Sequence, residues 1–186
     1  MPGKDAPIIT GPDGKPIPGD QANNLPPGST VDVSGNKAID LTDPAGNEMV
    51  FYGQTDGVPS SFIYQGIKNG IVQLQLTGGT FSSSRKFSVL GTHAKTKKPT
   101  RRLWGSGKGK FTTKGKYAAA TVRGTQWLIA DYADHTLVTV KRGLVAVQNF
   151  ATKKTTLVPA GKSIIVSKTL PRKHSKPSKP KTSKKK

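Results

Sequence analysis

The 186-residue chain contains no cysteine, a single glutamate and no long apolar run. The absence of cysteine excludes disulfides, thiolate metal sites and a cysteine nucleophile. Every apolar run falls short of the roughly 18 residues that a membrane helix requires. The N-terminus also lacks the basic start and apolar segment of a secretory signal. We therefore interpret the chain either as a protein that stays inside the cell or as a piece of a longer chain.

Acidic residues are nearly missing from the last two thirds of the chain. Residues 1–56 contain eight acidic and three basic residues, whereas residues 57–186 contain 27 basic and two acidic residues. The formal net charge of +20 hides this division. Such a positive field attracts polyanions. The plainer interpretation is that dispersed lysines keep the surface of the domain solvated.

The residue combinations of common enzymes are absent as well. The sequence has no GxSxG nucleophile motif, and Glu48 is its only glutamate. The glycine-rich WGSGKGK at 104–110 lacks the order of a phosphate-binding loop, and no helical pattern follows it. We therefore predict a protein that is not an enzyme, has no cofactor or resident metal, and acts on no small-molecule substrate.

Short apolar alternations separated by Gly, Asn, Asp and Pro clusters recur from Leu25 onward. In IVQLQL, Val72, Leu74 and Leu76 lie on one side and Ile71, Gln73 and Gln75 on the other, which predicts one buried and one solvated face. Ten such segments predict strands at 29–33, 38–42, 48–53, 60–66, 70–78, 121–130, 136–143, 143–150, 154–161 and 161–167. No window shows a helical apolar stripe. The pattern predicts an all-β fold, an antiparallel sandwich or roll.

Composition divides the chain into five segments. They are an extended Pro/Gly linker at 1–24, an N-terminal β region at 25–90, a basic glycine-rich loop at 91–116, a second β region at 117–167 and a Lys-rich tail at 168–186. An irregular strand pair around Trp104 is an alternative for the loop. The tail has nothing to bury in a core, so we predict that it is disordered.

Asp131, Asp134 and His135 crowd together in DYADHT. Carboxylates and imidazole can bind a metal or transfer a proton. However, adjacent residues of a strand point to opposite faces, and no downstream cluster completes a coordination shell. We favour a hairpin connection, in which the aspartates cap backbone N–H groups and His135 adopts a left-handed conformation.

Two aromatic residues, Trp104 and Phe111, lie among the cations of the 91–116 segment. Cations that contact phosphates beside an aromatic ring that stacks on a base are typical of single-strand binding. The plainer alternative is a solvated loop whose aromatic side chains pack on the sheet. The candidate polyanion-binding residues are Lys95, Lys97, Lys98, Arg101, Arg102, Trp104, Lys108, Lys110, Lys184, Lys185 and Lys186.

The stretch from Ala118 to Val166 resembles a FecR-type domain. The resemblance rests on AAATVRGTQWLIADYADHTLVTVKRGLVAVQNF followed by TTLVPAGKSIIV. A looser likeness, to versions in exported actinobacterial proteins, extends back to Leu25. The motif positions are Val122, Arg123, Gly124, Thr125, Gly143, Ala160 and Gly161. At Gly124 we also expect a strand bulge or a close backbone approach, with Trp127 and Leu128 on opposite faces.

The resemblance implies an extracytoplasmic, non-enzymatic β module of a bacterial envelope or surface protein. Its best-known relatives signal to a sigma factor through a helical segment and a membrane span. Neither appears here, so we expect a more general interaction role, with signalling as one form of it. The expected partners are an anionic polymer (cell-wall polymer, phospholipid surface or nucleic acid), bound through the tail, and another envelope protein. The alternative is a basic nucleic-acid-binding protein that uses the tail and the loop at 95–116.

Overall fold

The computed structural model describes residues 5–81 and 98–167, and these residues form twelve strands and one short 3-10 helix. All ten predicted strands are present, so the all-β prediction is confirmed. The elements are β1 Ile8–Thr10, η1 Gly19–Asn24, β2 Thr30–Asp32, β3 Ala38–Thr42, β4 Glu48–Tyr52, β5 Ser61–Lys68, β6 Ile71–Thr77, β7 Arg101–Lys114, β8 Ala118–Asp131, β9 His135–Arg142, β10 Leu144–Asn149, β11 Thr155–Pro159 and β12 Ser163–Ser167. Within the described residues, no helix has the length and apolar character needed to cross a membrane.

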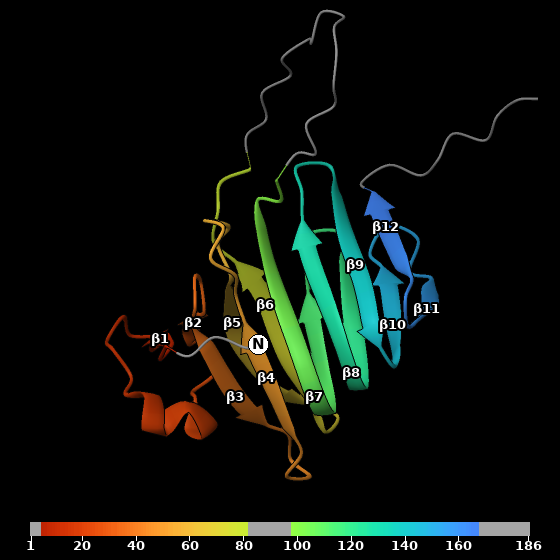
Figure 1. Ribbon diagram of the computed structural model, residues 1–186. Helices are drawn as coiled ribbons and strands as arrows, with labels where there is room; N and C mark the ends of the chain where they lie inside the picture. The colour runs from red at the N-terminus through yellow and green to blue at the C-terminus, as the bar shows by residue number, and fades with distance from the viewer. Residues whose placement is uncertain (1–4, 82–97, 168–186) are drawn as a thin grey trace, which may run out of the picture.

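The strands belong to one open hydrogen-bonded sheet that branches at its two longest members, β7 and β8 (Figure 1). These two strands pair with each other along most of their lengths. Toward one end of the pair, β4 joins β7 and β9 joins β8, which gives half A in the order β3-β4-β7-β8-β9-β12. Toward the other end, β6 and β10 join instead, which gives half B in the order β1-β2-β5-β6-β7-β8-β10-β11. The pairing of β6 with β7 is parallel, and every other strand pairing is antiparallel.

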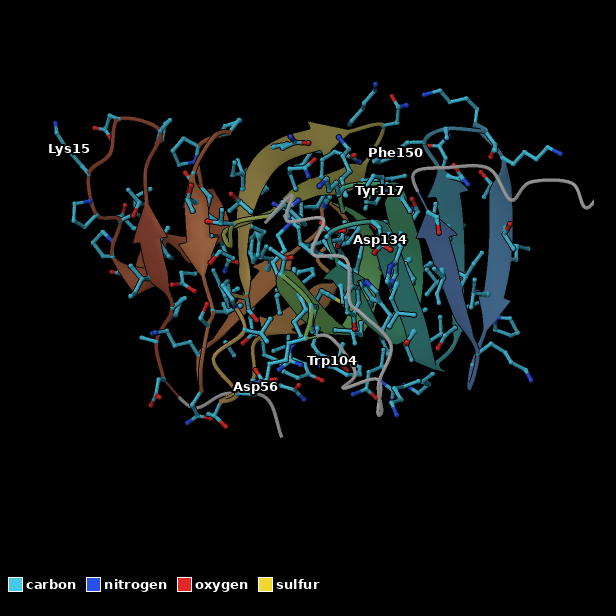
Figure 2. The ribbon with its side chains drawn as sticks, turned by 90° about the horizontal axis from the view of Figure 1, so that it is seen from above. Lys15, Asp56, Trp104, Tyr117, Asp134 and Phe150 are labelled. Atoms are coloured by element: carbon cyan, nitrogen blue, oxygen red, sulfur yellow. The ribbon has the colours of Figure 1, made fainter. Side chains whose placement is uncertain are left out.

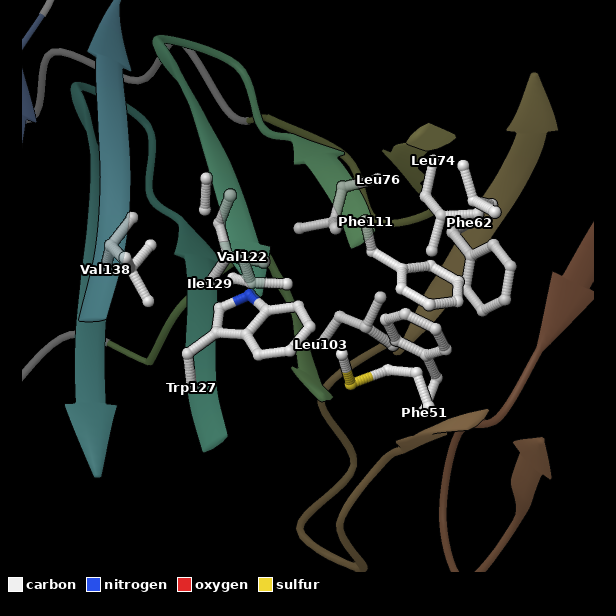
Figure 3. Close-up of a cluster of buried hydrophobic side chains, with 14 of the residues drawn as sticks. Phe51, Phe62, Leu74, Leu76, Leu103, Phe111, Val122, Trp127, Ile129 and Val138 are labelled. Atoms are coloured by element: carbon white, nitrogen blue, oxygen red, sulfur yellow. The ribbon is translucent and has the colours of Figure 1, made fainter. Parts of the chain in front are cut away.

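The two halves face each other across a shared hydrophobic core (Figure 3). Phe51 of half A lies at its centre, and its ring is 5.6 Å from the ring of Phe62 in half B. Its ring is also 5.4 Å from that of Phe111 and 5.9 Å from that of Trp127. All four side chains are completely buried. Because β4 and β5 are not paired, these ring contacts show that the sheet folds over on itself.

Gly124 lies where β8 passes from half B into half A. Val122 and Trp127 both face the core although an odd number of positions separates them, so the alternation of inward and outward residues reverses between them. Gly124 has a φ of +65°, in the left-handed region that favours glycine. Opposite it, the pairing of β7 with β8 shifts register between Gly107 and Lys110. The predicted bulge at Gly124 is therefore present, and the structure leaves the neighbouring Arg123 exposed.

Other motif positions lie where the chain crosses from one half to the other. Gly143 alone connects β9 of half A to β10 of half B. Ala160 and Gly161 lie in the turn from β11 of half B to β12 of half A, where the Gly161 N–H donates a 2.8 Å hydrogen bond to the Val140 carbonyl. The motif thus consists largely of the corners that fold one sheet into two facing halves.

Two of the predicted segments are wrong. The expected linker at 1–24 contains β1, which pairs with β2, and η1, and its Ile9 is buried in the core. The expected loop at 91–116 contains a 14-residue strand from Arg101 to Lys114, and its residues 91–97 lie outside the described part of the chain. At its inward glycines, the space is filled by other side chains or by the β4 backbone, so an apolar alternation is not visible in the sequence. The predicted disordered tail at 168–186 lies outside the described residues.

Candidate binding groove

An open groove of about 690 Å³ lies on the outer face of half A. Strands β4, β7, β8 and β9 form its floor, and the loops that follow β2 and β4 form its wall. Most of the side chains around it are polar. The lining residues are Gly35, Asn36, Tyr52, Gly53, Gln54, Thr55, Asp56, Trp104, Gln126 and Lys141.

An aromatic pair lies at the floor of the groove. Tyr52 and Trp104 are register partners on β4 and β7, and their rings are stacked with 6.2 Å between centroids and 8° between planes. The Gln126 Nε2 atom donates a 3.2 Å hydrogen bond to the Tyr52 hydroxyl, which holds the tyrosine ring in place. The indole N–H of Trp104 is buried and has no hydrogen-bond partner within the described residues. A buried donor without a partner is costly, so an acceptor supplied by a ligand would stabilise it.

Asp56 closes one side of the groove and neutralises a cation there. Its carboxylate forms an ion pair of 2.5 Å with Arg102, whose side chain is only 11% exposed. Burial alone would raise the pKa of Asp56, but the Val58 N–H and the Arg102 guanidinium lower this pKa below its ordinary value. Asp56 is therefore ionised at neutral pH. Figure 2 shows Asp56 and Trp104 on the same side of the molecule. Lys141, exposed on β9, is the cation of this lining, and it forms no ion pair with any residue that the structure describes.

Several predicted polyanion-binding residues have other roles. Arg101 and Arg102 are largely buried in ion pairs with Asp131 and Asp56, so neither guanidinium is free for a polyanion. Phe111 is in the core, as the plainer interpretation of aromatic side chains packed on the sheet expects, so the alternative of a stacking surface formed by Trp104 and Phe111 is wrong. The physical reason is that both side chains belong to one strand but point to opposite faces of the sheet.

The remaining predicted cations are distributed over the surface or lie outside the described residues. The Lys98 ammonium donates a 3.3 Å hydrogen bond to the Asp56 carbonyl. Lys108 is exposed and Lys110 is half-buried, both on β7. Lys95, Lys97, Lys184, Lys185 and Lys186 lie outside the described residues.

Asp131 has a structural position in the interior. Its carboxylate is fully buried and accepts a 2.8 Å hydrogen bond from Arg101 Nε. It also accepts 2.9 Å hydrogen bonds from the Lys116 backbone N–H and a 2.5 Å hydrogen bond from the Thr136 hydroxyl. The carboxylate thus joins β7, the β7–β8 turn and β9. The sequence interpretation of Asp131 as a turn cap missed this ion pair.

Asp134 and His135 lie at the hairpin that connects β8 to β9. The Tyr132 N–H donates a 2.8 Å hydrogen bond to the His135 carbonyl, and the two rings stack 4.4 Å apart. His135 Nδ1 lies 2.8 Å from Asp134 Oδ1. His135 is the first residue of β9 and has no positive φ, so the predicted left-handed conformation is wrong: the strand pairing begins at this residue. In the described part of the chain, no three acidic or histidine side chains gather in a way that could hold a metal.

Of the groove residues, the sequence interpretation identified Trp104 and missed Tyr52, Gln126 and Lys141. These three lie on separate strands, and the sequence contains no motif that connects them. The alternation within each strand could have placed two of them on the outer face. Tyr52 follows the buried Phe51, and Lys141 follows the buried Val140.

No family model matches this chain, and no curated protein matches it. Two crystal structures, each described as a putative anti-sigma factor from Parabacteroides distasonis, are similar to it, with 14% sequence identity and a TM-score of 0.43. The likeness covers 74% of this chain and 54% of each solved chain. The chain therefore spans about half the length of those solved chains. At this level of likeness, the two structures do not establish a family for the chain.

Proposed function

We propose that this chain is a non-enzymatic, FecR-like β module of an exported bacterial protein, and that its groove binds an anionic cell-wall polymer. The observation that carries the proposal is the stacked pair of Tyr52 and Trp104 on the groove floor. A flat aromatic surface bordered by a few convergent polar groups is the usual composition of a site for an organic ligand.

Each part of the groove has a partner on such a polymer. The apolar face of a sugar ring packs on Trp104, and its hydroxyl groups exchange hydrogen bonds with the amides of Asn36, Gln54 and Gln126. An acidic substituent faces Lys141, because the Asp56 charge is already compensated by Arg102. The unpartnered Trp104 N–H offers one further donor. The Lys-rich tail adds a salt-dependent attraction with little sequence preference.

The two tryptophans make the test specific. Trp127 is completely buried, whereas Trp104 lines the groove. We expect soluble glycan strands that bear carboxylates to change the fluorescence of Trp104 and to protect it from an aqueous quencher. Replacing Trp104 by alanine should weaken binding by about tenfold or more, because a central aromatic contact dominates such interfaces.

A pair of lysines provides the matched control. Lys141→Gln should weaken binding, whereas Lys162→Gln removes the same charge from the exposed β11–β12 turn and should leave the affinity nearly unchanged. If the Trp104→Ala variant binds the glycan as tightly as the parent, the proposal is wrong.

The same titration addresses nucleic-acid binding, because Trp104 could also stack on a base. A single-stranded oligonucleotide that binds more tightly than the glycan, and loses affinity with Trp104→Ala at every salt concentration, would favour that function instead.

A further inference from the structure

Half B has an apolar hollow of about 230 Å³ on its outer face. Strands β6, β7, β8, β10 and β11 contribute to it, and it shares no lining residue with the groove of half A. Most of its lining is aliphatic, with two cations beside it. The lining residues are Ile71, Lys110, Thr121, Val122, Arg123, Leu144, Ala146 and Leu157.

Two aliphatic side chains of the hollow are exposed. Leu144 is 49% exposed and Leu157 is 62% exposed. They lie on the same face, because Leu157 is the register partner of Ala146, two residues from Leu144 on β10. Contiguous apolar side chains on a sheet face beside an edge strand mark an interaction site or an aggregation hazard.

The two cations of the hollow lack a compensating charge. Lys110 and Arg123 are register partners on β7 and β8, and like charges directly opposite each other destabilise a strand pair. Among the described residues, no ion pair includes either side chain. The sequence has no acidic residue after Asp134, so β9 to β12 offer none. These cations add to the positive field of half B, which attracts an anionic partner.

The hollow adjoins a strand edge with unpaired backbone groups. Within the described chain, β11 pairs with β10 alone. The Asn149 N–H donates a 2.9 Å hydrogen bond to the Lys154 carbonyl at the start of this hairpin. Hydrogen-bonded and non-hydrogen-bonded residue pairs alternate along an antiparallel strand pair. The backbone groups of Thr156 and Val158 therefore bond to β10, whereas the N–H and carbonyl groups of Thr155 and Leu157 point away from β10, toward the open edge.

We propose that this edge binds an extended segment of another protein in which apolar and acidic residues alternate. The segment adds as a further strand beside β11, with its apolar side chains on the outer face next to Leu157. Its carboxylates point to the other face, and the positive field of a chain that has no acidic residue after Asp134 attracts them. Pro159 has no N–H and ends the pairing at the last residue of β11. The inference does not depend on the proposed function of the groove.

Charge and geometry favour this partner over three others. A second copy of the chain carries the same +20 charge and is repelled. The chain's own acidic N-terminal region forms β1 to β4, which lie at the opposite end of the sheet from β11 (Figure 1). The exposed apolar residues of the two neighbouring edge strands are Leu157 on β11 and Ile165 on β12. Leu157 lies on the outer face of half B and Ile165 on that of half A, so a flat anionic membrane could not contact both.

The test uses the full chain and a labelled peptide of about eight residues in which glutamate and leucine alternate, a length that matches an ordinary strand. Fluorescence anisotropy measures its affinity. A control peptide of the same composition, with all glutamates first and all leucines after them, has the same charge and apolar content but no alternation. A peptide N-methylated at alternate residues keeps both properties but cannot complete the edge hydrogen bonds. We expect both control peptides to bind at least about tenfold more weakly than the alternating peptide.

Two equally exposed residues provide matched variants of the protein. Leu157 and Ile165 are each 62% exposed, so lysine at either position is expected to leave the fold intact. Leu157→Lys should weaken peptide binding by about tenfold, since it removes an apolar contact from the interface. Ile165→Lys should have less than about a twofold effect on the same affinity.

Equal binding of the N-methylated peptide would overturn the proposal, as would equal losses from Leu157→Lys and Ile165→Lys. Binding to phosphatidylglycerol vesicles that is sensitive to Leu157→Lys, without binding of the alternating peptide, would assign the surface to a membrane instead. Because none of these variants lies in the groove, failure here would leave the glycan proposal unaffected.

Discussion

The Nε atom of Arg101 lies 2.8 Å from the Oδ2 atom of Asp131, and this ion pair joins the first residue of β7 to the last residue of β8. The two residues are also register partners, so the bond closes one end of the longest strand pair in the molecule. The arginine side chain is 13% exposed and the aspartate is fully buried. The pair therefore stabilises the two strands that belong to both halves of the sheet.

Removing the carboxylate at 131 should be strongly destabilising. Asp131→Ala leaves the largely buried Arg101 guanidinium and the Lys116 N–H without their acceptor, and we expect a loss of about 3 kcal/mol or more in the free energy of unfolding. Urea denaturation measures this loss. The control is Asp134→Ala, three residues away and 86% exposed, which should change stability by less than about 0.5 kcal/mol. A double variant that also carries Arg101→Met should be less destabilised than the sum of the single changes.

Acid should destabilise the protein through a buried aspartate in the β3–β4 turn. Burial alone would raise the pKa of Asp43, but hydrogen bonds from Asn47, the Lys110 N–H and the Ala45 N–H lower it below its ordinary value of 3.8. The folded state then binds fewer protons than the unfolded state near this pH. The stabilisation is therefore complete above the unfolded-state pKa and is lost as pH falls through the folded-state pKa.

Urea denaturation at a series of pH values below about 5 tests this linkage. We expect Asp43→Asn to flatten the acid limb of the stability curve, whereas Asp40→Asn, at an exposed position of β3, should leave its shape unchanged. A curve with the same slope in the parent and in Asp43→Asn would contradict the assignment.

The β7 strand shows why part of the fold could not be predicted. Its inward positions include Leu103, Gly105, Gly107 and Gly109, and three successive glycines at alternate positions suggest a loop. The space at these positions is filled from elsewhere: by the Trp127 ring at Gly105, by the β4 backbone at Gly107 and by the Phe111 ring at Gly109. Alternating apolar side chains revealed the other long strands, whereas the burial of β7 depends on neighbours that are distant in sequence.

The candidate groove could be predicted only in part for the same reason. Trp104 is conspicuous among its basic neighbours, but its stacking partner Tyr52 lies about fifty positions earlier in the sequence and meets it through the β4–β7 register. The β4–β7 pairing itself depends on β7, which the sequence interpretation treated as a loop. The ten strands that carry their own alternation were predicted, whereas the meeting of Trp104 with Tyr52, which requires long-range register, was not.

Gly105 should therefore not tolerate a side chain. A Cβ atom there would lie only 2.3 Å from the Trp127 ring, which is completely buried and has little room to move. We expect Gly105→Ala to destabilise the protein by about 2 kcal/mol or more in urea denaturation. A double variant with Gly105→Ala and Trp127→Leu should recover part of the lost stability, because leucine is smaller than tryptophan and leaves room for the added methyl group. If the double variant is as unstable as the sum of the two single variants, the ring contact is not the cause.

Alanine substitutions at Gly143 and Gly161 distinguish the energetic cost of a left-handed backbone from the cost of a steric clash. Gly143 and Gly161 have similar φ values, +82° and +76°, so alanine at either position carries a similar penalty for the left-handed conformation. At Gly161 the added Cβ meets nothing within 4 Å, and we expect a loss of about 1 kcal/mol. At Gly143 it would lie 2.7 Å from the Thr125 Cγ2 atom and 2.9 Å from the Gly124 carbonyl oxygen, so we expect about 2 kcal/mol beyond the conformational penalty. Thermal or urea unfolding of both variants measures the difference.

Adding Thr125→Ser to Gly143→Ala removes the methyl group of Thr125 and should restore part of the lost stability. Equal losses for the two glycines would mean that the corner at Gly143 is set by backbone conformation alone and not by its contact with β8.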